Sequence, residues 1–431
     1  MPFEAAAPRR RIAVIGGGIS GMGAAHMLAE DHEVTLIEAE PRLGGHARTI
    51  HCGPDGSQPV DTGFIVFNKV NYPHLVALFE KLEVPVVKSD MSFGASFMGG
   101  RLEYGLPSYR ALFSQRSNAV NPRFLRMLRD ILRFNARARD TARDSDLTIG
   151  GLMDVLRLGP WFREYYLLPF TGAIWSAPKQ QILEFPAQAM IRFLENHALL
   201  SRGGSHQWWT VEGGSVSYVR RLGRAMLDLG VDIRLGTPVA GVRRTMAAPE
   251  VRMHGGEWEA FDEVVLATHS DDSLALLADP TQDEAAALGA VRYQPNRTVL
   301  HSDPALMPHR RGCWSSWNYA EGVTGPGEAI DLTYWMNSLQ PIPHETPYFV
   351  TLNSTRPIRE DLIHDETTFR HPVYDRAALA AQADVARMNG QNGTWFCGAW
   401  MRNGFHEDGL ASAVAVAEGM ARRAPRLMAA E

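Results

Sequence analysis

Three glycines and one acidic residue near the start of the chain have the types and spacing of a nucleotide-binding site. Gly16, Gly18 and Gly21 form a Gly-x-Gly-x-x-Gly turn, and Glu38 follows Gly16 by 22 positions. In such a turn the first glycine allows a tight bend, the second lets backbone N–H groups approach a pyrophosphate, and the third lets a helix pack closely on a strand. The helix dipole favours the phosphate charge, and a carboxylate at the position of Glu38 accepts ribose hydroxyls. These residues predict a dinucleotide site.

Two apolar segments flank the turn and supply the strands that must hold it. Residues 11–15 read Arg-Ile-Ala-Val-Ile, and residues 33–37 end immediately before Glu38. With the helix expected between them, they form a strand–helix–strand unit. The sequence therefore predicts the α/β class, with a Rossmann-like parallel sheet.

Motifs after Glu38 resemble the flavin family that includes amine oxidases, phytoene desaturases and protoporphyrinogen oxidase. Residues 42–49, Arg-Leu-Gly-Gly-His-Ala-Arg-Thr, are similar to the Arg-x-Gly-Gly-x-x-x-Thr continuation of that family. A nicotinamide site has no need of a second glycine pair at this point. Residues 61–65, Asp-Thr-Gly-Phe-Ile, are similar to the family's strand end that passes beside the flavin.

Later segments resemble the same family in the same order. Residues 231–239 are similar to the strand that grips adenine, and residues 262–268 to the strand that returns to the dinucleotide domain. Residues 395–398 and 407–412 resemble the segment that places backbone N–H groups at the pyrimidine end of the flavin. The resemblance implies an FAD cofactor bound by Gly16, Gly18, Ile19, Ser20, Gly21, Glu38, Ala39, Arg42, Gly44, Gly45, His46, Gly63, Phe64, Ile65, Val239, Gly398, Asp408, Gly409 and Leu410.

The motifs divide the chain into two interleaved parts. We expect a Rossmann-like FAD-binding domain in three discontinuous segments, residues 10–75, 205–275 and 390–431. The two insertions, residues 76–204 and 276–389, are expected to pack together as an α+β substrate domain over the flavin, as the resemblance implies.

A flavin accepts the hydride itself, so the informative residues are those beside its N5 atom. The resemblance implies that His406 immediately precedes the helix that contacts the flavin, where a histidine near its unperturbed pKa can accept a proton at neutral pH. His269 and His301 are alternative bases, and a structural role is the other interpretation of each histidine. Asp408 is expected to cap the helix. Many amine oxidases of this family hold a water near N5 with a lysine from the later half of the chain, whereas no lysine follows Lys179 here. This departure argues against amine oxidation.

The amino-acid composition limits the classes of function that the chain could have. The chain has 431 residues, 45% hydrophobic and 21% charged, and a net charge of −5, which is typical of a folded protein and gives no nucleic-acid signal. Three cysteines without metal-ligand spacing predict no metal site and fit a reducing cytoplasm. Hydrolase motifs are absent from the sequence. A cytoplasmic location is expected, because neither an apolar signal core nor a span of about 20 apolar residues is found. The oligomeric state is left open.

Residues 121–140 predict a basic amphipathic helix that begins with Asn121 as cap and Pro122 at the first position. The apolar face is expected to gather Phe124, Leu125, Leu128, Ile131 and Leu132, with Met127 and Phe134 at its edge. Five arginines are expected opposite: Arg123, Arg126, Arg129, Arg133 and Arg137. This arrangement suits peripheral binding to the anionic inner face of a membrane, and a helix with its arginines in water is the alternative.

Clusters of aromatic residues in the insertions favour an apolar substrate tunnel, with domain core as the other interpretation. Residues 61–68 and 314–319 most resemble a bacterial branch, the amine-oxidase-like FAD dehydrogenases of furan fatty acid biosynthesis. The resemblance implies a desaturase that converts a methylated monounsaturated acyl chain to a diene, with the electron acceptor left open. The alternatives are a flavin-dependent isomerase of fatty-acid or polyene double bonds, an amine oxidase, and a non-catalytic protein like the prenyl-protein escorts.

Overall fold

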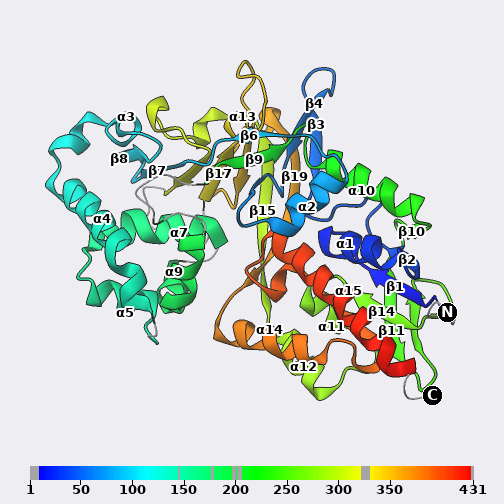
Figure 1. Cartoon of the computed structure of the whole chain (residues 1–431). Coiled ribbons are helices and arrows are strands. Elements are labelled where there is room, and N and C mark those ends of the chain that lie inside the picture. Colours follow the sequence, from blue (N-terminus) through cyan, green and yellow to red (C-terminus); the bar gives the residue numbers. More distant parts are fainter. Residues whose placement is uncertain are drawn as a thin grey trace.

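Two large β-sheets organise the chain, one wholly parallel and one mixed, with a helical lobe beyond the mixed sheet (Figure 1). No helix in the described part is both long and apolar enough to cross a bilayer. The computed structural model describes the following residues: 9–143, 146–175, 179–196, 200, 206–321 and 331–428.

The parallel sheet has the strand order β10–β2–β1–β14–β20. Their bounds are Asp232–Arg234, Glu33–Ile37, Arg11–Ile15, Glu263–Leu266 and Thr394–Phe396. Because side chains alternate along a strand, the sheet contributes to a core on each face. One core includes the helices α1 (Ile19–Leu28), α10 (Val216–Asp228) and α15 (His406–Met428), and the other includes α12 (Gln282–Gly289) and α14 (Arg376–Met388).

The mixed sheet has the order β19–β15–β18–β17–β16–β7–β8, in which only the β16–β7 pair is parallel. The bounds are Ile363–Val373, Arg292–His301, Phe349–Leu352, Asp331–Trp335, Trp317–Ala320, Phe93–Phe97 and Leu102–Gly105. The sheet joins strands from both predicted insertions. The boundaries predicted for the two domains stay a prediction.

Three small sheets complete the described strands. They comprise β3 (Thr49–Cys52) with β4 (Gln58–Asp61); β5 (Val66–Asn68), β9 (Trp208–Val211) and β6 (Val86–Ser89); and β11 (Val239–Arg244), β12 (Pro249–Met253) and β13 (Trp258–Ala260). The short helices outside the lobe are α2 (Pro73–Lys81), α3 (Tyr109–Leu112), α11 (Ser270–Leu276) and α13 (Met336–Leu339).

The helical lobe lies on the side of the molecule opposite α1 and β1 (Figure 1). It is built from α4 (Pro122–Ala142), α5 (Ile149–Val155), α6 (Pro160–Phe162), a π-helical turn (Arg163–Leu167), α7 (Leu168–Trp175), α8 (Lys179–Glu184) and α9 (Ala187–Asn196). The predicted start of α4 is confirmed, because the Asn121 side chain accepts the N–H groups of Arg123 and Phe124 at 3.0 and 3.4 Å.

The predicted orientation of α4 is wrong. Met127 and Phe134, expected at the edge of the apolar face, are fully buried, whereas Leu125 and Leu132 are exposed. The buried face is shifted because it also contains Asp130, whose carboxylate accepts the Gly159 N–H at 3.0 Å. This hydrogen bond engages one of the two carboxylate oxygens of Asp130, and hydrophobicity alone does not identify such a buried polar residue.

Candidate cofactor site and histidine group

The glycine turn between β1 and α1 has one open side. Gly16 has a φ of +108°, and its N–H donates to the Ile37 carbonyl at 2.9 Å. A Cβ on Gly21 would lie 1.8 Å from the Gly16 carbonyl oxygen, so only glycine lets the helix come this close. A Cβ on Gly18 would meet no atom within 4 Å. Gly18 therefore borders open space at the N-terminus of α1, where backbone N–H groups favour a phosphate.

A second glycine turn lies against the first. The Gly44 N–H donates to the Gly17 carbonyl at 2.8 Å, and Gly44 and Gly45 have φ values of +111° and +55°. A Cβ on Gly45 would lie 3.0 Å from the Gly18 Cα, so the turns approach closely because both carry glycine. The Arg42 guanidinium donates to the Gly45 carbonyl at 3.1 Å and braces this turn. Its predicted contact with the cofactor stays a prediction.

Glu38 lies at the end of β2 and faces the glycine turn. Its two carboxylate oxygens accept the N–H groups of Gly17 at 2.5 Å and Glu40 at 2.7 Å. Each oxygen keeps a further lone pair, which suits a pair of ribose hydroxyls. The Thr237 N–H donates to the Glu38 carbonyl at 2.9 Å, which brings Val239, two residues later, toward the same end of the site.

The C-terminal segment meets the start of α1, as the motif resemblance implied. The Gly398 N–H donates to the Ser412 hydroxyl at 2.9 Å, and this hydroxyl donates to the Gly409 carbonyl at 2.6 Å. A Cβ on Gly409 would lie 2.8 Å from the Ser20 Oγ and 2.9 Å from a methyl carbon of Ile19. The N-terminal ends of α1 and α15 are therefore in direct contact.

Asp408 caps the start of α15, as predicted, from within the first turn. It is the third residue of that helix, and its carboxylate reaches back to the N–H groups of Phe405 at 2.9 Å and Asn403 at 3.2 Å. Burial raises the pKa of Asp408 to about 6. Leu410 is buried against α1, where a Cβ on Gly23 would lie 2.6 Å from its side chain.

The segment after β4 joins the second glycine turn to α15. A Cβ on Gly63 would lie 2.0 Å from the His46 carbonyl oxygen, and the Phe64 N–H donates to that oxygen at 2.9 Å. The Phe64 ring stacks on the His406 ring, with centroids 3.9 Å apart and planes at 12°. Ile65, the next residue, is buried.

Four histidines from separate segments gather beside these turns, and we call His46, His269, His371 and His406 the histidine group. The His46 ring centroid lies 5.8 Å from those of His269 and His371, and it stacks on Phe369 at 4.7 Å. Burial is the main cause that lowers the pKa of His46 and His269 to about 4, and of His371 and His406 to about 3. All four imidazoles are therefore neutral at pH 7.

His406, the first candidate base, is the first residue of α15. Its Nε2 lies 2.6 Å from the Tyr218 hydroxyl. Burial raises the pKa of Tyr218 well above its ordinary value, so the hydroxyl keeps its proton and donates it to Nε2. His406 would accept a substrate proton through Nδ1, or through Nε2 after Tyr218 moves. Burial lowers the pKa of His406 to about 3, away from the expected unperturbed value, so the ring is a weak proton acceptor at pH 7. Its role as base stays a prediction.

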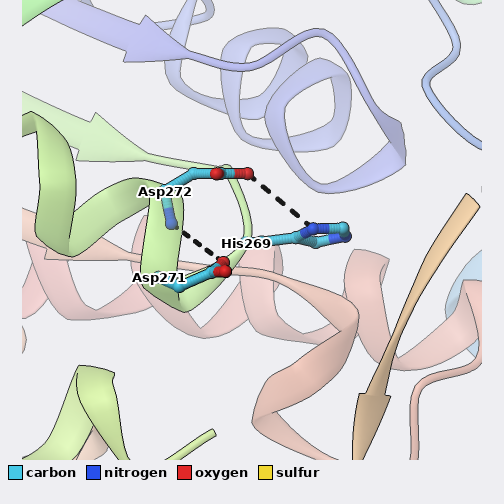
Figure 2. A group of neighbouring side chains, drawn as sticks. All are labelled: His269, Asp271 and Asp272. Carbon is cyan, nitrogen blue, oxygen red and sulfur yellow. Dashed lines mark hydrogen bonds and ion pairs between the residues drawn. The ribbon is translucent and has the colours of Figure 1, made fainter. Parts of the chain in front are cut away.

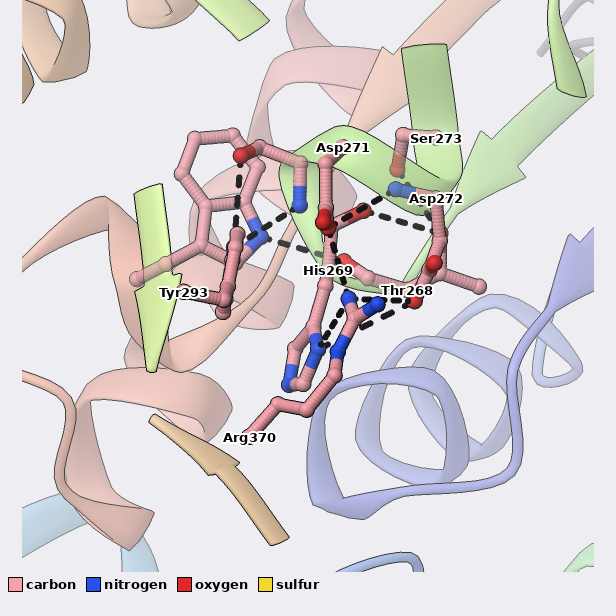
Figure 3. Close-up of polar contacts among 9 residues, drawn as sticks. Thr268, His269, Asp271, Asp272, Ser273, Tyr293 and Arg370 are labelled. Atoms are coloured by element: carbon pink, nitrogen blue, oxygen red, sulfur yellow. Dashed lines mark hydrogen bonds and ion pairs between the residues drawn. The ribbon is translucent and has the colours of Figure 1, made fainter. Parts of the chain in front are cut away.

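His269, an alternative base, follows β14 and is held by Arg370 (Figure 3). One Arg370 nitrogen lies 3.1 Å from His269 Nδ1, 2.8 Å from an Asp271 oxygen and 3.1 Å from an Asp272 oxygen. Because a guanidinium only donates, Nδ1 accepts and the ring proton is on Nε2. The ring stacks on Tyr293 at 4.3 Å. His269 is thus arranged as a hydrogen-bond donor rather than as a free base.

His269, Asp271 and Asp272 also offer three ligand atoms within 4.8 Å of one another, the one such group found in the described residues (Figure 2). The Arg370 guanidinium is already the cation bound by these carboxylates. A metal ion would have to displace it, and we assign no metal to this group.

His301, the third candidate base, lies outside the histidine group. It is at one end of β15, whereas His371 pairs with Gln294 at the other end, roughly 20 Å away along the strand. Its Nε2 lies 2.7 Å from the Thr351 hydroxyl, and its Nδ1 accepts the Asp303 N–H at 3.0 Å. The structure therefore corrects this prediction, because both ring nitrogens of His301 are engaged inside the sheet.

Several residues of the site were not identified from the sequence. Tyr218, Arg370 and His371 belong to no motif, and only the fold brings them to the candidate bases. Glu407 caps α2 by accepting two N-terminal N–H groups at 3.0 and 2.9 Å. The proline that begins α2 indicates a helix start, but no local signal pairs it with Glu407.

The residues present fit a dinucleotide. Gly18 borders open space at a helix N-terminus, and Glu38 retains acceptors for a ribose. A side chain at Gly18 would enter the space that a pyrophosphate needs. Direct contacts with the cofactor stay predictions for the other candidate residues, including the exposed Ala39.

The chain is similar to flavoproteins of known sequence. A family model described as flavin containing amine oxidoreductase matches residues 19–305. Hydroxyneurosporene desaturase from Cereibacter sphaeroides is 25% identical over 353 residues, which are 73% of this chain and 64% of the desaturase. The chain thus spans less than two thirds of that relative's length.

Solved structures share the fold. A candidate protoporphyrinogen oxidase from Exiguobacterium sp. 255-15 has a TM-score of 0.71 at 18% identity, covering 96% of this chain and 99% of that chain. The CLA-producing fatty acid isomerase from P. acnes has a TM-score of 0.66 at 15% identity, covering 96% and 98%. The chain belongs to the flavin containing amine oxidoreductase family, which confirms the predicted Rossmann-like fold and the predicted FAD cofactor.

Proposed function

We propose that the protein is an FAD-dependent dehydrogenase that introduces a double bond into an apolar lipid acyl chain. The substrate that we favour is the methylated monounsaturated chain of furan fatty acid biosynthesis, which becomes a diene. The observation that supports this proposal best is a wall of aromatic side chains beside Phe64 and His406, where the histidine group is neutral.

The aromatic wall connects the start of α15 to the helical lobe. Phe405, which immediately precedes His406, stacks on Phe193 of α9 with ring centroids 5.2 Å apart. Partly buried aromatic residues continue the same core over the π-helical turn, α7 and the strands β16 and β17: Tyr165, Phe170, Trp317 and Tyr334. We propose that these partly buried rings also contact the substrate, in which case they would favour an alkyl or polyene chain over a charged one.

An alkylammonium substrate has less support. The nearby carboxylates of Glu407 and Asp408 are both engaged by backbone N–H groups. The 252 residues after Lys179 contain no lysine to hold a water in the manner of many amine oxidases. Amine oxidation therefore remains the weaker alternative.

Desaturation removes a hydride and a proton from neighbouring carbons. The flavin, when bound, supplies the hydride acceptor. The side chains of the wall orient the acyl chain and exclude water, and His406 is the proposed proton acceptor, with Tyr218 orienting its ring. His269 would contribute an N–H donor rather than accept the proton.

A fatty-acid or polyene isomerase is the second candidate. It would use the same apolar wall, but the hydride would return to the substrate. The fold shared with a fatty acid isomerase favours this alternative, whereas the sequence similarity to a desaturase favours dehydrogenation.

The test is product analysis with an artificial electron acceptor. The holoenzyme is incubated with detergent-dispersed phospholipid that carries a methyl-branched monounsaturated chain, and the acyl chains are analysed by mass spectrometry. Loss of two hydrogens supports the proposal. A product of unchanged mass with a moved double bond would indicate the isomerase, and turnover of amines alone would contradict both lipid proposals.

A further inference from the structure

We infer that the outer edge of the helical lobe, together with the adjoining helix α3, docks on an anionic phospholipid bilayer. The docking surface, which we call the arginine face, consists of the exposed side chains of residues 101–143, which include α3 and α4. These elements lie at the edge of the molecule opposite the parallel sheet (Figure 1). The choice of a bilayer as partner rests on the proposed lipid substrate, and the surface itself is identified by its charge and exposure.

The arginine face is strongly positive in a protein of net charge −5. Residues 101–143 contain ten arginines, no lysine and three acidic residues. Two of these acids, Glu103 and Asp130, are fully buried, and Glu103 is bound by Arg310 at 2.8 Å. Within residues 101–143, Asp140 is the one acid that lies at the surface.

Most arginines of α4 are available to an outside partner. Arg139 pairs with Glu195 at 3.0 Å, and Arg133 donates to carbonyls at the end of α5. Among the described residues, no acidic partner is found for the exposed arginines of the remaining turns: Arg123, Arg126, Arg129 and Arg137. A phosphate-bearing surface would supply the missing anions.

Apolar side chains are exposed among these arginines. Tyr109 is 86% exposed, Val120 81%, Leu132 56% and Leu125 43%. Leu125 and Leu132 are seven residues apart, so they share one side of α4 about 10 Å from each other. The ring contact between Phe113 and Phe124, 6.1 Å between centroids, anchors α3 at the start of α4.

This combination fits a bilayer better than a nucleic acid. Nucleic acids bind arginines through phosphates but give no partner for exposed leucine and valine, whereas a membrane interface accepts apolar side chains beside basic ones. The position also suits the proposed substrate. Helix α4 packs on α9, and Phe193 of α9 stacks on Phe405, so one layer of helices separates the arginine face from the aromatic wall.

Vesicle binding of the holoenzyme tests the inference without turnover. Vesicles contain either phosphatidylcholine alone or an equal mixture with phosphatidylglycerol, with unbranched acyl chains that are not substrates. The expected result is binding to the anionic vesicles that is lost near 1 M salt, where the Debye length is about 3 Å. The double variant Arg126→Gln/Arg129→Gln should bind about 30-fold more weakly, since each arginine near the surface contributes about fivefold.

A matched control is available on α10, which carries exposed arginines and an exposed leucine. Arg220→Gln/Arg224→Gln should leave binding unchanged, and Leu125→Ser/Leu132→Ser should weaken it whereas Leu227→Ser should not. Flavin absorbance and thermal unfolding verify that each variant is folded. Equal binding to both vesicle types, or equal effects on α4 and α10, would overturn the inference.

Two further outcomes separate the docking surface from the proposed function. Tighter binding to double-stranded DNA than to the anionic vesicles, with no effect of the leucine changes, would overturn the bilayer assignment. Charge-dependent vesicle binding without desaturation of detergent-dispersed lipid would support the docking surface while refuting the proposed function. Desaturation without charge-dependent vesicle binding would support the proposed function while refuting the docking surface.

Discussion

The open side of Gly18 allows cofactor binding to be separated from folding by one substitution. Gly18 has φ −75° and ψ −177°, which any residue can adopt, and its Cβ would meet no atom within 4 Å. Gly18→Val should therefore change the free energy of unfolding of the apoprotein by no more than about 0.5 kcal/mol. Its methyl groups would occupy the space of the pyrophosphate.

The expected loss of FAD affinity is large. If two hydrogen bonds to the charged pyrophosphate are prevented, at about 1.5–3 kcal/mol each, the dissociation constant should rise about 10²- to 10⁴-fold. Calorimetric titration of apoprotein with FAD measures this change, and the flavin absorbance of the purified protein provides an independent readout. Urea unfolding of the apoprotein measures the effect on folding.

Two other glycines are controls. Gly256 lies in the turn between β12 and β13 with ordinary van der Waals space for a Cβ, so Gly256→Val should keep both stability and FAD. Gly21→Val should destabilise the apoprotein severely, because its Cβ would lie 1.8 Å from the Gly16 oxygen. Two results would refute the assignment of Gly18 to the pyrophosphate site. One is full FAD content in Gly18→Val, and the other is a Gly18→Val apoprotein that is as unstable as Gly21→Val.

Three further predictions concern the histidine group. His406→Ala should lower steady-state turnover about 10²-fold or more if His406 is the base, and unchanged turnover would refute that role. The lowered pKa values mean that the unfolded chain binds protons below its ordinary histidine pKa of about 6.5 while the folded chain does not. The free energy of unfolding should therefore keep the full contribution of these histidines above pH 6.5 and fall toward pH 4 by about 1.4 kcal/mol per pH unit for each histidine. Equal urea midpoints at pH 7 and pH 5 would contradict this prediction. Arg370→Met should create Zn²⁺ binding at His269, Asp271 and Asp272, and calorimetric binding of Zn²⁺ there by the unaltered protein would be evidence against the role of the guanidinium.

Local patterns predicted the parts of the site that depend on nearby residues. Gly16, Gly18, Gly21 and Glu38 lie within one strand–helix–strand unit, so their spacing specifies their geometry. The contact between Tyr218 and His406 joins residues 188 positions apart, and no spacing encodes it. Contacts of this kind follow from the pairing of distant strands and the packing of helices.

The error in the predicted buried face of α4 has a related cause. A helical wheel places the apolar face at the centre of its hydrophobic residues, which is the side of Leu125 and Leu132. The lobe instead packs against Met127 and Phe134 and takes in Asp130, because Gly159 supplies a hydrogen-bond donor. The side of α4 that is buried therefore includes a contact with Gly159, which lies 29 positions from Asp130 in the sequence.

Anaerobic single turnover shows whether the bound flavin takes its electrons from a lipid acyl chain. The holoenzyme is mixed without oxygen with phospholipid carrying the methyl-branched monounsaturated chain, and the visible flavin band and the acyl products are measured together. One diene should form for each flavin that bleaches. A moved double bond without bleaching, or bleaching by amines but not by lipid, would contradict it.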